Sequence, residues 1–175
     1  VLKEALEKNQ VSIMSICSGA NFIYRDALKD EVAHMDAVSK MAADFGVSYI
    51  TLCGGAIRAA GIQDGDYTLL AEGVAEVKKV IESYGLKASY HPHLGAMVEK
   101  PEQIERLFEL SDIDMCPDVA HIQAGGGDPL AVVKKYYDRI SFMHLKDLDE
   151  NGFAPLGTGS VKLDEIITYL KDRGY

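Results

Sequence analysis

Apolar runs of strand length alternate with amphipathic stretches of helical length along the whole chain. The apolar runs predict five strands: Val11–Cys17, Val47–Cys53, Leu86–His91, a short strand that reaches Asp118, and Arg139–Leu145. The amphipathic stretches predict six helices: Val1–Lys8 as the end of one, then about Lys29–Phe45, Tyr67–Tyr84, Pro101–Leu110, Asp128–Tyr137 and Lys162–Arg173. The segment with Gly152, Gly157 and Gly159 is predicted to be a polar loop.

Residues at the predicted helix ends support these boundaries. Gly46, Gly85 and Gly174 each follow a helix, where the chain needs a positive φ that glycine adopts easily. Asp128 and Pro129 suit the N-cap and the first turn of the helix that they begin. Helix, glycine, strand, loop and helix is the order of repeated βαβ units, so we expect parallel strands that are buried on both faces.

Two architectures have such parallel strands. Five strands could form an open doubly wound sheet, whereas a closed (β/α)8 barrel needs about 250 residues. The chain has 175 residues, opens with Val1 inside a helix, and stops at Gly174–Tyr175, where another strand is due. We therefore predict one α/β domain over residues 1–175, an incomplete (β/α)8 TIM barrel that lacks its first two strands and its last.

Composition and charge reduce the number of functional classes to consider. Apolar residues make up 47% of the chain and charged residues 26%, as in ordinary soluble proteins. A net charge of −9 argues against a nucleic-acid partner. No run predicts a membrane span or a secretory signal, so we expect a cytoplasmic protein without a membrane partner. Cys17, Cys53 and Cys116 are widely spaced, and we expect three reduced, mostly buried thiols.

Four of the five histidines lie at or just beyond a predicted strand end, which is where parallel α/β folds bind ligands. His91 and His93 flank Pro92, and positions two apart in a strand face the same side, so both imidazoles could face one cavity. A polar pair bonded to loop backbone is the alternative. His34 falls in a helix and is expected to be a surface residue or a helix residue with its hydrogen bonds satisfied.

The next two strand ends add a carboxylate and two more imidazoles. Asp118 and His121 form an Asp-x-x-His motif, which suits Mn²⁺, Mg²⁺, Co²⁺ or Zn²⁺, although an N-cap aspartate followed by an unrelated histidine has the same pattern. His144 follows from the next strand, with Lys146 two residues on and on the same side. Because three successive strand ends carry such residues, a shared functional site is favoured over the alternative that each residue has only a structural role.

Other motifs point to no specific chemistry. Gly125–Gly127 before Asp128 could bind phosphate at a helix N-terminus, but the P-loop lysine and the dinucleotide fingerprint are missing. No Gly-x-Ser-x-Gly elbow occurs, and no cysteine has an evident histidine partner. The sequence therefore gives no case for a nucleophile.

Four segments together resemble the xylose isomerase-like barrel superfamily of sugar isomerases and epimerases, nearest to its inosose dehydratase branch. They are HPHLGAMVE, PDVAHIQAGGGDP, DRISFMHLKD and PLGTGSVKLDEI, and the resemblance runs over essentially all 175 residues. It implies a (β/α)8 barrel that holds one divalent metal and acts on a small sugar or polyol, usually as a homo-oligomer.

The resemblance also implies roles for individual residues. Asp118 and His144 would bind the metal, and His121 would hydrogen-bond a substrate hydroxyl or carbonyl. His91 takes the place where many relatives supply a glutamate ligand, and another glutamate ligand would lie beyond Tyr175. The usual Asp-Thr-Gly-His has become Asp118-Val119-Ala120-His121, which keeps the ligand spacing but alters the turn.

The chemistry common to the family is removal of a proton next to a carbonyl to give an enediolate, which a divalent cation stabilises. His93, Glu99 and Lys146 are candidates for the remaining acid and base roles, although Glu99 also suits the start of a helix. An isomerase or epimerase is the first hypothesis, and an inosose dehydratase-type lyase is the alternative. An endonuclease IV-like phosphodiesterase and a non-catalytic barrel are weaker ones. In either enzyme, Asp118→Ala is predicted to abolish metal binding.

Overall fold

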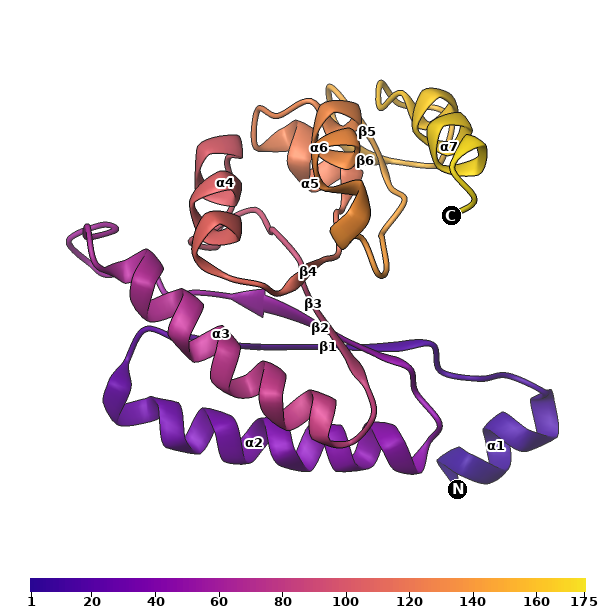
Figure 1. The fold of residues 1–175 in the computed structure, drawn as a ribbon. Helices are drawn as coiled ribbons and strands as arrows, with labels where there is room; N and C mark the ends of the chain where they lie inside the picture. The colour runs from indigo at the N-terminus through magenta and orange to yellow at the C-terminus, as the bar shows by residue number, and fades with distance from the viewer.

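A four-stranded parallel sheet forms the centre of the molecule in the computed structural model, which describes residues 1–175 (Figure 1). Its strands lie side by side in chain order: β1 Ser15–Ala20, β2 Tyr49–Gly54, β3 Lys87–Tyr90 and β4 Asp114–Met115. Every pairing in it is parallel. Because consecutive strands are neighbours throughout, the sheet has the strand order of a barrel wall and not the reversal of a doubly wound sheet.

Seven α-helices accompany the strands. They are α1 Leu2–Asn9, α2 Arg25–Asp44, α3 Asp66–Ser83, α4 Pro101–Leu110, α5 Val119–Ala124, α6 Pro129–Tyr136 and α7 Leu163–Asp172, and a 3-10 turn covers Tyr137–Arg139. The long helices α2 and α3 run side by side along one face of the sheet (Figure 1). The helix α1 buries no residue, so it contributes little to the core.

The main core lies between the sheet and the α2–α4 layer and contains 23 buried residues. The helix α3 supplies Leu70, Val74, Val77 and Ile81, whose spacing of three or four residues places them on one helix face. Gly73 on the same helix lets its backbone approach the loop after β1, since a Cβ there would lie 2.5 Å from the carbonyl oxygen of Phe22. A smaller cluster of eight buried residues joins α5, α6 and α7.

The predicted helix ends are confirmed. Gly46, Gly85 and Gly174 have φ of 69°, 74° and 78°, in the left-handed region that glycine tolerates. The Asp128 side chain accepts hydrogen bonds from the backbone N–H groups of Leu130 and Ala131 and so caps α6.

The predicted fifth strand, Arg139–Leu145, is wrong as a continuous element. The segment makes only two isolated parallel bridges, Met115 with Ile140 and Asp118 with His144. Its neighbour β4 is only two residues long, and Pro117 lacks the N–H that a longer ladder would need. The bridge to Asp118 nevertheless places His144 where the strand would have placed it.

Two other elements were not predicted. The expected polar loop contains an antiparallel hairpin, β5 Asp147–Asp149 and β6 Gly152–Ala154, because Gly152 takes a φ of 121° directly after a two-residue turn. The segment after Asp118 forms the short helix α5, since the Asp118 side chain caps it.

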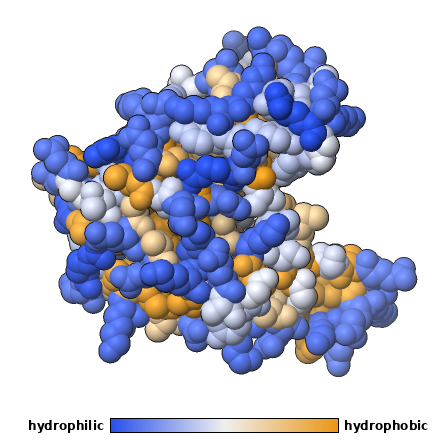
Figure 2. All heavy atoms as spheres, in the orientation of Figure 1, coloured by the Kyte–Doolittle hydropathy of each residue, from blue (hydrophilic) through white to orange (hydrophobic).

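Hydrophilic residues cover most of the face shown in Figure 2, and apolar residues gather along its lower side. The same view is hollowed between the part that carries α7 and the part that carries α1. None of the helices is long and apolar enough to cross a membrane.

Candidate active site at the strand ends

A cavity of about 510 Å³ opens at the carboxyl ends of the strands. Its walls come from β1, β2, the loop after β3 and the segment that bridges to Asp118. The lining residues are Cys17, Cys53, His91, His93, Met143, His144, Leu145 and Lys146. Both imidazoles of the His-Pro-His motif thus face one cavity, as the sequence predicts.

Asp118 lies beneath this cavity and is completely buried. Its Oδ1 accepts hydrogen bonds from the backbone N–H groups of Ala120 and His121, both at 3.1 Å, and so begins α5. Its Oδ2 has no partner with hydrogen-bond geometry. That oxygen nonetheless lies 3.7 Å from Nδ1 of His144 and 3.0 Å from Nζ of Lys146, so it faces two nitrogen groups and forms an ion pair with Lys146.

Two groups of donors cluster closely enough to share a cation. Within each group the ligand atoms lie within 4.8 Å of one another: His91, His93 and His121 in one, and His91, Cys116 and His144 in the other. His91 belongs to both. Its Nδ1 lies 3.3 Å from the carbonyl oxygen of Cys116, an arrangement in which Nε2 is free to bind a ligand.

Burial and neighbouring charge set the ionisation of these groups. Burial, and then His144, lowers the pKa of His91 to about 4. Burial also lowers the pKa of His121 to about 4. Burial of Asp118 favours its neutral form, but contacts with His144, the N–H of His121 and Lys146 outweigh it and hold its pKa below the usual value. Near neutral pH the site therefore contains a carboxylate and neutral imidazoles, the forms that bind metals.

The low pKa of His91 predicts an acid-sensitive fold. The unfolded chain takes up a proton at its ordinary pKa near 6.5, whereas the folded chain takes it up only near pH 4. Stability is therefore complete above about pH 6.5 and falls as the pH drops towards 4, by about 3 kcal/mol from His91 alone. Urea unfolding between pH 7 and pH 4 measures this. His91→Gln should flatten the profile, while the exposed His34→Gln should leave it unchanged.

Lys146 connects Asp118 to His121. Its Nζ lies 3.1 Å from Nε2 of His121 and 4.9 Å from the ring centre of Phe153 on β6. Phe153 also lies against the His121 ring, with 5.1 Å between the ring centres. The hairpin therefore provides one wall for the Lys146–His121 pair.

Asp147 holds that hairpin to the loop after it. Its carboxylate is buried and accepts hydrogen bonds from the backbone N–H groups of Leu148, Gly157, Gly159 and Val161. These bonds lower its pKa against the opposing effect of burial. The sequence analysis gave this residue no role.

Glu99, a candidate acid or base, makes no hydrogen bond or ion pair with the histidine cluster. Its carboxylate accepts a hydrogen bond from the backbone N–H of Gly95 at 2.6 Å, which closes its own loop. The alternative interpretation, a residue beside the helix α4 that follows, agrees better with this position. His34 is exposed on α2, as expected.

The expectation of mostly buried thiols is wrong for two of the three cysteines. Cys116 is buried, but Cys17 is exposed and Cys53 is half-buried, and both line the cavity. They lie on β1 and β2 on the side that faces the cavity, where the helices on the other face of the sheet do not cover them.

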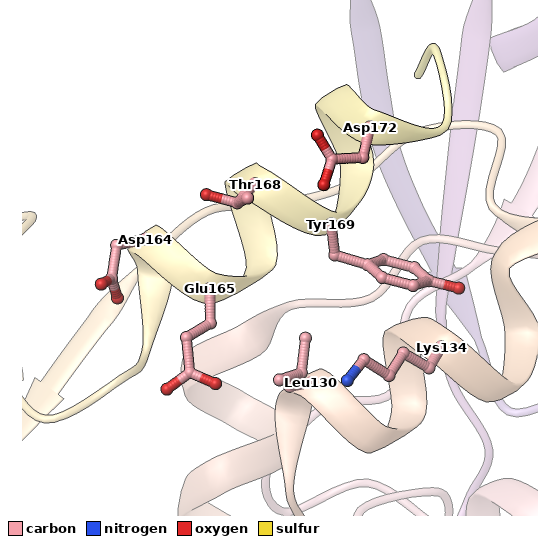
Figure 3. Close-up of a pocket in the computed structure, with 7 residues that line it drawn as sticks. All are labelled: Leu130, Lys134, Asp164, Glu165, Thr168, Tyr169 and Asp172. Carbon is pink, nitrogen blue, oxygen red and sulfur yellow. The ribbon is translucent and has the colours of Figure 1, made fainter.

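A second cavity, of about 360 Å³, lies between α6 and α7 (Figure 3). Its walls carry the carboxylates of Asp164, Glu165 and Asp172, with the Lys134 ammonium 5.6 Å from the Tyr169 ring centre. No histidine or thiol lines it, whereas the strand-end cavity contains both.

The parallel strands with helices between them, and a polar cavity at the carboxyl ends, define a partial (β/α) barrel. The profile of the Xylose isomerase-like TIM barrel family matches residues 1–175, and the chain belongs to this family.

Curated relatives are similar in sequence to most or all of this chain. An inosose dehydratase from Geobacillus kaustophilus is 28% identical over 163 residues, which is 84% of this chain and 53% of the relative. One from Clostridium perfringens (strain ATCC 13124) is 29% identical over 210 aligned positions, which cover 100% of this chain and 70% of the relative. The chain thus spans about half the length of the first and seven tenths of the second.

Solved structures show the same fold. A probable 3-DHS dehydratase, AsbF, from Bacillus anthracis superposes with a TM-score of 0.82 at 16% identity, over 99% of this chain and 72% of that one. The IOLI protein, whose structure contains a bound zinc atom, superposes with a TM-score of 0.79 at 18% identity, over 99% and 69%.

Proposed function

We propose that this chain forms the metal site of a divalent-metal-dependent enzyme that dehydrates a keto-polyol of the inosose type through an enediolate. One observation carries the proposal: Oδ2 of the buried Asp118 faces His144 and Lys146, and His91 lies beside His144 in the same cavity. A carboxylate oxygen and two imidazole nitrogens are a donor set for Mn²⁺, Co²⁺ or Zn²⁺, and Mg²⁺, which prefers oxygen ligands, is the alternative.

The residues fit such an ion. Asp118, His144 and His91 would hold it. Oδ1 of Asp118 caps α5 and Nδ1 of His91 contacts a backbone carbonyl, so Oδ2 of Asp118 and Nε2 of His91 would be the metal ligands. The Lys146 ammonium now pairs with Oδ2, which shows that this position favours positive charge. When bound, a divalent cation would polarise the substrate carbonyl and stabilise the enediolate. The zinc in the IOLI protein supports the same type of site.

His121 and Lys146 are suited to move a proton between them. A neutral imidazole accepts a hydrogen bond at only one ring nitrogen, and Nδ1 of His121 already accepts one from the backbone N–H of Leu94 at 3.3 Å. The ring proton therefore lies on Nε2, which faces Nζ of Lys146 at 3.1 Å. His93 lies against His121, with 4.0 Å between the ring centres and 37° between the ring planes, so it is close enough to act with this pair.

The candidate reactions begin with the same proton removal and differ in the step that follows. The inosose dehydratase relatives favour elimination. An isomerase or epimerase, the first hypothesis from the sequence, shares the initial proton removal and is kept as the second candidate. A homo-oligomer, a cytoplasmic location and a site without nucleic acid remain predictions.

The test is an assay of the Mn²⁺-loaded protein with a panel of inososes and ketoses in D₂O, followed by mass spectrometry. Dehydration is expected to remove one water from an inosose. A product of unchanged formula that has gained deuterium would support the isomerase or epimerase instead. Failure to bind Mn²⁺ at all would contradict both.

A further inference from the structure

Cys17 and Cys53 bring two thiols together at the mouth of the cavity. Their Sγ atoms are 3.7 Å apart, although the residues are 36 positions apart in the chain. In the parallel register Gly19, two residues after Cys17, is the partner of Cys53. Because side chains two apart in a strand share a face, the two thiols project from the same face of the sheet.

Gly19 keeps the space beside the Cys53 thiol open. A Cβ at Gly19 would lie 3.2 Å from the Cys53 Sγ and 2.4 Å from the Cys53 carbonyl oxygen. The strand pair can therefore be this close only with glycine at that position. With glycine at position 19, the Cys53 sulfur lies beside the Cys17 sulfur and faces the cavity.

The sulfur separation suits a shared cation better than a disulfide. In a tetrahedral zinc site the Zn–S distance is about 2.3 Å, which places two thiolate ligands roughly 3.8 Å apart. A disulfide needs about 2.05 Å between the sulfurs, so the two thiols would have to move closer together. At 3.7 Å, two thiolates can bind one ion without movement of the sheet.

We propose that Cys17 and Cys53 form a two-thiolate site for one soft metal ion such as Cd²⁺, Zn²⁺ or Cu⁺, separate from the Asp118–His144–His91 site. Soft sulfur ligands select such ions over Mg²⁺ or Mn²⁺. Each thiol loses its proton to solvent as its sulfur–metal bond forms, so one bound ion releases up to two protons and no oxidant is needed.

The ionisation of the pair agrees with this geometry. The hydrogen bond from Cys17 lowers the pKa of Cys53 to about 6, while the same contact raises the pKa of Cys17. One thiolate is therefore available at neutral pH, and the second forms as the ion displaces its proton. Because both cysteines line the substrate cavity, an ion held there would also obstruct it.

The test uses CdCl₂ alone, titrated into the full chain after chelator treatment and removal of reductant. The ultraviolet charge-transfer absorbance of cadmium–thiolate bonds and the number of reactive thiols are followed together. We expect the absorbance to appear as two of the three thiols become unreactive, and EDTA to reverse both changes. Cys17→Ser and Cys53→Ser should each remove the absorbance and weaken Cd²⁺ binding by more than about 100-fold, beyond the usual effect of removing an outer-shell partner.

Cys116→Ala is the matched control and should keep the absorbance. If Cys116→Ala removes it while Cys17→Ser and Cys53→Ser keep it, the ion binds to the His91–Cys116–His144 group and the inference is wrong. If thiol reactivity returns with a reductant but not with EDTA, the two cysteines form a disulfide, and this result would also overturn the inference. Asp118→Asn should lose Mn²⁺ yet retain the cadmium–thiolate absorbance, which separates this site from the proposed catalytic one. Thermal melts of each variant confirm that the fold is kept.

Discussion

Asp118→Asn is expected to weaken divalent-metal binding by about 100-fold or more, equivalent to roughly 3 kcal/mol, and to lower turnover by about 10²–10³-fold. The amide keeps an oxygen at the position of Oδ1, so the cap of α5 survives, because asparagine is as good an N-cap as aspartate. The negative charge that faces His144 and Lys146 is lost. Mn²⁺ titration by calorimetry and the D₂O assay measure the two effects.

Asp128→Asn is the matched control for Asp118→Asn. Asp128 caps α6 with the same pair of backbone contacts but is exposed and lies outside the cavity. It should leave metal binding and turnover unchanged. Equal metal affinity in the Asp118 variant and the parent chain would remove Asp118 from the metal site.

Gly73→Ala is expected to lower the free energy of unfolding by about 2–3 kcal/mol, and Tm by roughly 5–10 °C. The added methyl would lie 2.5 Å from the Phe22 carbonyl oxygen, and a backbone oxygen cannot turn away as a flexible side chain can. Phe22 itself is fully buried at a φ of 62°, and its N–H is bonded to Glu31, so the loop cannot easily yield. The helix α3 must move instead.

Gly65→Ala is the control for the effect of losing a glycine. Gly65 is the N-cap of the same helix, with a φ of −84° and no atom within 4 Å of an added Cβ. Its substitution should change stability by less than about 0.5 kcal/mol. Similar losses in both variants would mean that the contact with Phe22 is not the cause.

The repeating pattern of the chain was sufficient to predict the barrel architecture. The helices Pro101–Leu110 and Pro129–Tyr136 begin at a proline and are found where expected. The gathering of His91, His93, His121 and His144 also followed from topology, since residues at the ends of parallel strands share an edge. Local signals thus determined both the elements and the location of the candidate site.

Features that depend on contacts between distant residues were not predicted. The thiol pair requires the register of β1 on β2, which single-strand patterns do not contain. One signal was present, since Cys17 and Cys53 each end an apolar run at the same point of the repeat. The four hydrogen bonds to Asp147 could not be predicted either, because their donors lie up to 14 residues away in the sequence.

The hydrogen bonds of Asp147 have a consequence for motion around the site. Three of the amides that it binds, at Gly157, Gly159 and Val161, belong to a segment without helix or strand. Amides in such a segment normally exchange their hydrogen with solvent quickly, because loops open at little cost in free energy. Here the exchange of these three should be slow and should accelerate together as Asp147 is protonated. While Asp147 is ionised, the wall beside Lys146 should therefore behave as a fixed part of the barrel and not as a lid.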